Sequence, residues 1–362
     1  MKIRIYIYSI IIVLLTSCGS MGPKSIRAGR MEYNLALGQS DSEQLLLNIV
    51  KMRFVDRAVF LNVTSMTSNL SFQSEISTTT TGIFDSVAFP TSANPSFTWK
   101  DNPTITYEEL TGVEYVTQML SPIPVDTIVL LLQSWPASMV LPLALNEIND
   151  VNNDWNPINP TISSTASVQH KKFNEITEAI QFLDAQRTLE WSVIRTDAEN
   201  THAIETAILL NNHPGDKTEK TIALLLSSLG LAKSKEGNTK FSIEYGLEAK
   251  DDSTLVLGTR SMQDILTYAS LDIDIPPELA DRALINTHAK DVEVQDKLLH
   301  IRTSPYRPRN ASVAVEYHGA WFYVQADDLQ SKATFLLIQM LMGMQSGASS
   351  SGAPVLTIPI SS

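Results

Sequence analysis

The sequence predicts an α+β fold in which antiparallel strands and helices occupy separate stretches of the chain. Alternating apolar residues mark extended segments at residues 62–107 and 313–324, whereas helical spacing of apolar residues prevails elsewhere. Hydrophobic residues make up 43% of the 362 residues, which is enough to build packed cores, and no repeat of fixed period is visible. We therefore expect two domains of ordinary size.

The first helix is expected from residue 41 to about Phe54. Ser40 with Glu43 matches a capping box, and apolar residues then recur at helical spacing. Residues 19–30 carry Gly, Ser, Pro, Lys and Arg without an apolar period. The sequence therefore predicts a tether over residues 18–40.

Residues 62–107 predict one long β-hairpin or two short ones. Residues 62–81 contain 11 Ser or Thr, and the apolar residues among them share one parity: Met66, Leu70, Phe72 and Ile76. A second extended stretch carries Phe97, Trp99 and Ile105, but its alternation is weaker. This pattern indicates an apolar face and a hydroxyl-rich face.

Two helices are expected between residues 108 and 134. The first stops before Pro122, and Pro124 opens the second, whose centre is almost continuously apolar. Residues 149–168 are rich in Asn, Pro, Ser and Thr and predict a linker. The expected domains are therefore an N-terminal α+β domain at 41–148 and a C-terminal α+β domain at 169–362.

The C-terminal half is expected to alternate helices and strands. Helical spacing marks residues 173–183, 217–229 and 262–269, and strands are predicted at residues 189–194, 241–247, 254–257 and 298–302. Residues 313–324 predict a hairpin that turns at His318-Gly319. Asp328 can cap a final apolar helix ending near Gly347, before a last strand at residues 355–360.

Strong catalytic and metal-binding signatures are absent from the sequence. It contains no phosphate-binding glycine loop, no HExxH, no paired CxxC and no GxSxG motif. We therefore expect no enzymatic activity, no cofactor and no metal site.

Two pairs of polar residues form weaker constellations. His202 and Glu205 are three apart on a possible helix, where two metal ligands could lie, but an exposed polar face explains them better. Asp272 and Asp274 alternate along an extended segment, as paired carboxylates do in acid–base catalysis. Two solvated acids beside Pro276-Pro277 explain this second pair as well, so we favour a structural interpretation of both.

Three further segments are also interpreted as structural. Ser349–Ser351 is typical of a linker rather than of a nucleophile. His318 suits a turn, because histidine tolerates left-handed backbone better than most residues. The Met340–Met344 cluster lies at helical spacing, which favours core packing over a ligand surface.

The N-terminal residues carry a sorting signal around the only cysteine of the chain. Lys2 and Arg4 precede an apolar run of 11 residues, Ile5–Leu15, shorter than the roughly 20 that a spanning helix needs. The following Leu15-Thr16-Ser17-Cys18 resembles the lipobox of bacterial lipoproteins. That resemblance implies removal of the signal peptide 1–17, a diacylglycerol on the Cys18 sulfur, and usually a further acyl chain such as palmitate. Gly19 in place of Asp resembles lipoproteins sent to the outer membrane.

The charge of the processed chain bears on its partners. Removing residues 1–17 takes away two basic residues and no acid, which leaves a formal net charge of −14. This surplus of acid argues against nucleic acid and against a polybasic grip on anionic lipid. The acyl chains on Cys18 are therefore the expected membrane contact, and two or three of them anchor durably.

The processed chain as a whole is similar to uncharacterised bacterial envelope lipoproteins. The resemblance rests on Ser42–Asp56, Pro103–Gly112, Thr259–Ala269 and Ala320–Phe335. It implies a location in the cell envelope, on the outer membrane and facing the periplasm, and it implies no activity, cofactor or catalytic residue.

The leading interpretation is a non-enzymatic, outer-membrane-anchored lipoprotein that binds unknown protein partners or itself. One alternative is an oligomeric pore or secretion component, since 9–11 alternating residues suffice for a membrane-spanning strand and Met66–Ile76 has 11. One hairpin cannot close on itself, so this alternative needs a ring of identical chains. A second alternative is an envelope hydrolase.

Overall fold

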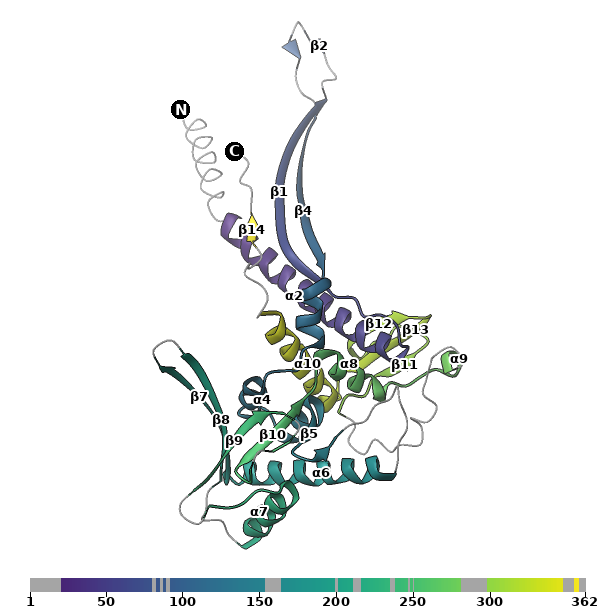
Figure 1. Cartoon of the computed structure of the whole chain (residues 1–362). Helices are drawn as coiled ribbons and strands as arrows, with labels where there is room; N and C mark the ends of the chain where they lie inside the picture. The colour runs from purple at the N-terminus through teal and green to yellow at the C-terminus, as the bar shows by residue number, and fades with distance from the viewer. Residues whose placement is uncertain are drawn as a thin grey trace. The chain divides into compact units, whose positions relative to one another are not determined.

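The protein, seen in a computed structural model, is an α+β protein made of two compact units (Figure 1). The structure describes residues 21–79, 83–84, 87–88, 92–153, 164–198, 201–210, 216–234, 238–246, 248–249, 251–280, 298–347 and 355–357. Met1–Ala58 and Met119–Met344 form the first unit, which we call the body. Val59–Gln118 and Gln345–Ser362 form the second, the hairpin unit. Cys18 and the expected signal peptide lie outside the described residues.

A six-stranded sheet is the centre of the body. Its strand order is β6-β5-β10-β9-β8-β7, and only β9 and β10 run parallel. In that order the strands are Val151–Asn152, Leu145–Ile148, Thr254–Thr259, Thr239–Tyr245, Thr201–Leu210 and Leu189–Ala198. The helices that accompany this sheet are α4 (Val125–Leu132), α5 (Ala137–Ala144), α6 (Ser164–Ala185) and α7 (Asp216–Leu229). The expected stripe on α6 is buried: Phe173, Ile176, Ile180 and Leu183.

This sheet divides the chain differently from the sequence prediction. Strand β5 lies before the expected linker 149–168 and β6 lies within it, yet both belong to the same sheet as β7–β10. The expected linker also contributes the first turns of α6, from Ser164 onward. Composition rich in Asn, Pro and Ser indicates a break in regular structure, which is not the same as a break in packing.

A second, three-stranded antiparallel sheet in the body packs on the first long helix. Its order is β11-β13-β12, with strands Arg302–Ser304, Ala320–Gln325 and Ala311–Tyr317, and β12 contacts α2 (Met21–Arg53). The ring of Phe54 lies 5.7 Å from that of Tyr317 and 6.1 Å from that of Phe322. The Tyr317 hydroxyl donates to Asp56, and burial together with this carboxylate raises the pKa of Tyr317.

Helix α2 begins much earlier than predicted. It runs from Met21, so residues 21–40 of the expected tether are helical and the expected start of the helix at residue 41 is wrong. Ser42 lies inside the helix, and its hydroxyl donates to the carbonyl of Gly38 at 2.7 Å. Ser40 is therefore no N-cap.

A buried arginine joins several elements of the body. Arg260 is 3% exposed and lies between β10 and α8 (Met262–Ala269). Its guanidinium donates to the carbonyls of Pro142 (2.7 Å), Leu143 (3.2 Å) and Asn153 (3.2 Å), and its Nε donates to Asn146 Oδ1 (2.8 Å). Two of these carbonyls belong to the last turn of α5, where a cation is favourable for the helix dipole.

A buried asparagine forms a second tie. Asn149 turns the chain between β5 and β6 with a φ of 49°, a left-handed conformation that asparagine tolerates. Its Nδ2 donates to the carbonyl of Leu229 at 2.6 Å, and its Oδ1 accepts from the backbone N–H of Val256 at 2.8 Å. The residue thus joins the end of α7 to the central strand β10.

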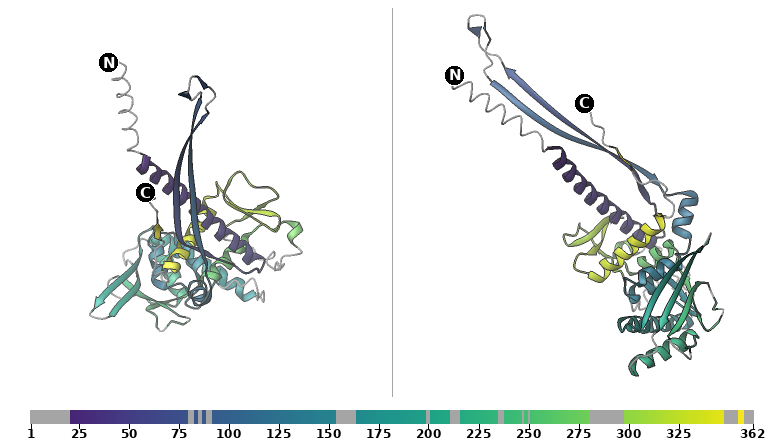
Figure 2. Two further views of the ribbon diagram at one scale, coloured as in Figure 1. Left: turned by 90° about the horizontal axis from the view of Figure 1, so that it is seen from above. Right: turned by 90° about the vertical axis from the view of Figure 1, so that its left-hand side faces the viewer.

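The hairpin unit is dominated by two long strands. β1 (Leu61–Thr79) pairs antiparallel with β4 (Ser92–Glu109) from end to end, and both views in Figure 2 show them as one coiled ribbon. The short strands β2 (Ile83–Phe84) and β3 (Val87–Ala88) pair between them, and β14 (Val355–Thr357) runs parallel to β1 beside residues 65–67. Of the two expected alternatives, one long hairpin or two short ones, the structure shows the long hairpin.

Candidate functional site

The register of the β1–β4 ladder places only polar residues on one of its two faces. Directly paired residues of antiparallel strands lie on the same face, and successive residues alternate between faces. From Ser65↔Thr106 to Thr79↔Ser92, every second pair defines this face. Its β1 residues are Ser65, Thr67, Asn69, Ser71, Gln73, Glu75, Ser77 and Thr79, and its β4 residues are Thr106, Thr104, Asn102, Lys100, Thr98, Ser96, Asn94 and Ser92. We call this the polar face.

The opposite face gathers the apolar residues of both strands. Its β1 residues are Met66, Ser68, Leu70, Phe72, Ser74, Ile76 and Thr78, and its β4 residues are Ile105, Pro103, Asp101, Trp99, Phe97, Pro95 and Ala93. Phe72 pairs with Trp99, and Met66 pairs with Ile105. Asp101 is the one charged residue among these positions. We call this the apolar face.

The base of the ladder is fixed by a bulge and by the third strand. The register shifts between Val63 and Ser65, so Thr64 is the extra residue and the faces defined above start at Ser65. The Ser65 hydroxyl donates to Thr106 Oγ1 at 3.0 Å. Met66 is 8% exposed beside β14. The register after the bulge thus places the weakly alternating apolar residues of β4 on the same face as those of β1.

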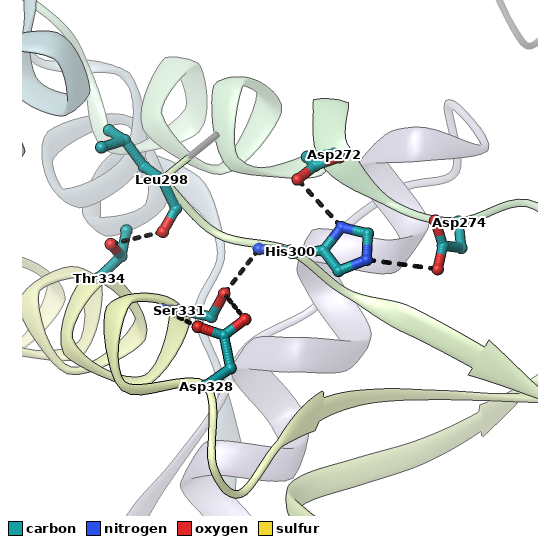
Figure 3. A network of polar contacts seen from close by, with 7 residues as sticks. All are labelled: Asp272, Asp274, Leu298, His300, Asp328, Ser331 and Thr334. Atoms are coloured by element: carbon teal, nitrogen blue, oxygen red, sulfur yellow. Dashed lines mark hydrogen bonds and ion pairs between the residues drawn. The ribbon is translucent and has the colours of Figure 1, made fainter. Parts of the chain in front are cut away.

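A histidine bridges two aspartates in the body (Figure 3). His300 Nδ1 lies 3.0 Å from Asp272 Oδ2, and His300 Nε2 lies 3.4 Å from Asp274 Oδ2. Asp272 ends the short 3-10 helix η3 (Ser270–Asp272), and its side chain is 12% exposed, against 53% for Asp274. The expectation of two solvated acids is therefore wrong for Asp272, and the structure brings both candidates to one histidine.

The backbone explains why these three side chains meet. Ile273 and Ile301 form a parallel bridge, in which Ile301 N donates to the Asp272 carbonyl (3.0 Å) and Asp274 N donates to the Ile301 carbonyl (2.9 Å). Residues 272 and 274 flank the bridge on one segment and residue 300 flanks it on the other. The backbone alone therefore brings His300 beside both aspartates. Arg53, in the last turn of α2, adds a charge nearby: burial lowers its pKa, and the charge of Asp272 partly offsets this.

The nearest hydroxyl to His300 is engaged in capping a helix. Asp328 caps α10 (Leu329–Gly347), as predicted: Ser331 N donates to Asp328 Oδ1 at 3.0 Å, and Ser331 Oγ donates to Oδ2 at 2.7 Å. The backbone N–H of His300 donates to Ser331 Oγ at 2.9 Å. Desolvation alone would raise the pKa of Asp328, but the Ser331 hydrogen bonds, with His300 and Arg302 nearby, hold it below its usual value.

This arrangement fixes the segments 270–274 and 298–302 to one another and to α10. Ser331 Oγ accepts from the backbone N–H of His300 and donates to the Asp328 carboxylate, which also caps α10. Thr334 Oγ1 adds a further tie to the carbonyl of Leu298 at 2.7 Å. The contacts are those of a structural junction.

The remaining candidates are placed as follows. His202 and Glu205 lie on strand β8, not on the possible helix, so residues three apart fall on opposite faces of the sheet. His318 is the predicted turn residue, with a φ of 50° before Gly319 at 80°. In the Met340–Met344 cluster only Leu341 is fully buried and Met344 is exposed. Ser349–Ser351 lies outside the described residues.

A cluster of metal ligands or a hollow among the described residues could also form a binding site. Among those residues no group of three or more His, Cys, Asp and Glu side chains is arranged to hold a metal ion. One hollow of about 730 Å³ in the body is lined by mixed charges and two tryptophans, including Trp135, Asp184, Arg187, Glu190 and Trp191. Burial raises the pKa of Asp184. With a cation and two acids in the lining, the hollow selects no single ligand chemistry.

The comparisons with known proteins add no family. No protein-family model, no curated protein and no solved structure matches the chain. Of the helices described, none combines the length and the apolar character needed to cross a membrane. The hairpin was foreseen from sequence, whereas His300 was missed, because neither a motif nor a fixed spacing connects it to Asp272.

Proposed function

We propose that the chain is a lipid-anchored, non-enzymatic component of the bacterial outer membrane that acts through its β1–β4 hairpin. The observation that carries the proposal is the ladder itself, which pairs 18 residues of β1 with 18 of β4. At about 3.3 Å per residue such strands reach roughly 60 Å. An isolated two-stranded hairpin is marginal in water, so a ladder of this length needs a partner.

The anchor in this proposal is Cys18. Acyl chains on its sulfur and amine hold the acidic body on the periplasmic side, where the hairpin meets protein partners or further copies of the chain. We also propose that the chain has no catalytic activity. This part of the proposal is supported by the junction around His300, in which the polar groups are engaged with one another and with the cap of α10.

The anchor is tested by Cys18→Ser. The variant should keep residues 1–17 and incorporate no radiolabelled palmitate, because the acylated sulfur is missing. The measurement is the mass and the lipid label of the chain isolated from membranes. Lipid-labelled, processed Cys18→Ser chain would end this part of the proposal.

The role of the hairpin in binding partners is tested by crosslinking in living cells, after which the crosslinked partners are identified by mass spectrometry. Residues 68–103 are replaced by an Asn-Gly turn, because Thr67 and Thr104 are paired and a two-residue turn joins such neighbours. This shortened-hairpin chain should remain acylated and folded but lose the crosslinks of the wild type. Unchanged crosslinks would show that the body, not the hairpin, binds the partners.

A further inference from the structure

We infer that the apolar face of the hairpin contacts the acyl chains of the outer membrane, and that neighbouring copies of the chain complete the membrane-spanning sheet. This inference rests on the proposed function and names the partner of the hairpin. It starts from the contrast between the two faces, one uniformly polar and the other carrying every aliphatic and aromatic residue of the paired segments 65–79 and 92–106.

The height of the apolar band fits a bilayer. It extends from Met66 to Ile76 on β1 and from Pro95 to Ile105 on β4, and these end residues pair with each other across the ladder. Each strand therefore contributes 11 residues to the band. A tilted strand needs about 9–11 residues to cross the roughly 30 Å of hydrocarbon.

The polar face fits water on the other side of the sheet. Its 16 positions carry hydroxyls, amides, one Glu and one Lys, so their formal charges cancel. Membrane-spanning strands alternate in this manner, with apolar residues toward lipid and polar residues toward an aqueous interior.

Further copies of the chain are needed to pair the outer edges of the described ladder. In the described sheet β4 is an outer strand, and β14 covers β1 only beside residues 65–67. Unpaired backbone groups do not persist in hydrocarbon, so the edges must be paired there. Pro95 and Pro103 lack an N–H, which leaves residues 96–102 as the stretch of β4 between them in which every outward-directed N–H can donate to a neighbour. Identical hairpins, edge to edge, form a ring around a water-filled pore.

The test uses full-length chain in native outer membranes containing a phospholipid with a photoreactive group near the end of its acyl chain. After illumination, mass spectrometry maps the labelled residues. In the wild type we expect label on residues 66–76 and 95–105. Phe72→Lys should reduce this label by about tenfold or more, whereas Gln73→Lys, on the polar face, should leave it unchanged. The paired positions Trp99→Lys and Thr98→Lys repeat the comparison in case one variant fails to fold.

Asp101→Leu separates lipid from a protein partner, because it removes the one charge on the apolar face. If the apolar face contacts lipid, the variant should carry more acyl label than the wild type. If a protein docks on this face instead, the variant should lose a contact with that protein and the corresponding crosslink. Hairpin residues crosslinked to another protein but free of acyl label would overturn the inference and leave the proposed function standing. Loss of both label and hairpin-dependent crosslinks would overturn both.

Discussion

The body and the hairpin unit reach stability by different means. The body closes its structure with buried polar ties such as Arg260 and Asn149, each joined to several elements that are distant in sequence. The hairpin unit extends one antiparallel ladder over 19 and 18 residues and adds a third strand beside only three of them. The buried polar groups of the body thus find their partners within the chain, whereas we propose that the ladder takes its partner from outside the chain.

The largest expected effect is on the body, from Arg260→Met. Removing the guanidinium takes this donor from the buried Leu143 carbonyl and leaves the Pro142 carbonyl with Asn153 Nδ2, so we expect the free energy of unfolding to fall by about 3 kcal/mol or more. Chemical denaturation of the soluble chain measures this. Arg307→Met is the matched control, because Arg307 is exposed over the ring of Trp321 and should cost at most about 0.5 kcal/mol. Equal effects would contradict a structural role for Arg260.

A smaller loss is expected from Asn149→Gly. Glycine keeps the left-handed backbone but loses the bonds to Leu229 and Val256, so the free energy of unfolding should fall by about 2 kcal/mol. Arg187 has a similar φ of 54° and is exposed, so Arg187→Gly should stabilise the body by up to about 1 kcal/mol. A stabilising Asn149→Gly would show that the two hydrogen bonds contribute nothing.

The next effect depends on pH. Asp328→Ala removes the cap of α10 and should lower the free energy of unfolding by about 1 kcal/mol at neutral pH. Because the folded state lowers the pKa of Asp328, this contribution is fully present above the unfolded value of about 4 and is lost as the pH falls through the folded value. Wild type and variant should therefore converge in acid. A difference that persists unchanged at low pH would contradict the role of the ionised carboxylate.

The smallest effect on the body is expected from the shortened hairpin. Replacing residues 68–103 by Asn-Gly retains the base of the ladder, so the free energy of unfolding of the body should change by less than about 0.5 kcal/mol. Trp99 is removed by this change, so the fluorescence of the remaining tryptophans reports on the body alone. Collapse of the body would show that the two units are not independent.

Local signals in the sequence predict much of the body. The residues 262–269 are helical as expected, because Ser261 and Asp264 form a capping box there. The end of α7 at Gly230 and the turn at His318-Gly319 follow from the left-handed backbone at those residues. These features depend on neighbours in sequence, which is why sequence patterns suffice.

Contacts between distant segments could not be predicted in the same way. The junction of His300 with Asp272 depends on the bridge between Ile273 and Ile301, to which no local pattern points. The two faces of the hairpin depend on a bulge at Thr64 and on a register that pairs Phe72 with Trp99. Alternation within one strand predicts that the strand has an apolar face and a polar face. Only the pairing shows that the apolar residues of both strands lie on the same face of the hairpin.

The most direct test of the two-faced hairpin is a scan of single cysteines along β1 from residue 66 to residue 76. Each full-length chain carries an environment-sensitive fluorophore in native outer membranes, and quenching by a lipid-phase nitroxide is compared with quenching by aqueous iodide. Unsubstituted chain gives the background from Cys18. We predict a period of two, with lipid quenching strongest at Leu70 and Phe72 and aqueous quenching strongest at Ser71 and Gln73. Equal aqueous quenching at all 11 positions would contradict the membrane contact of the apolar face.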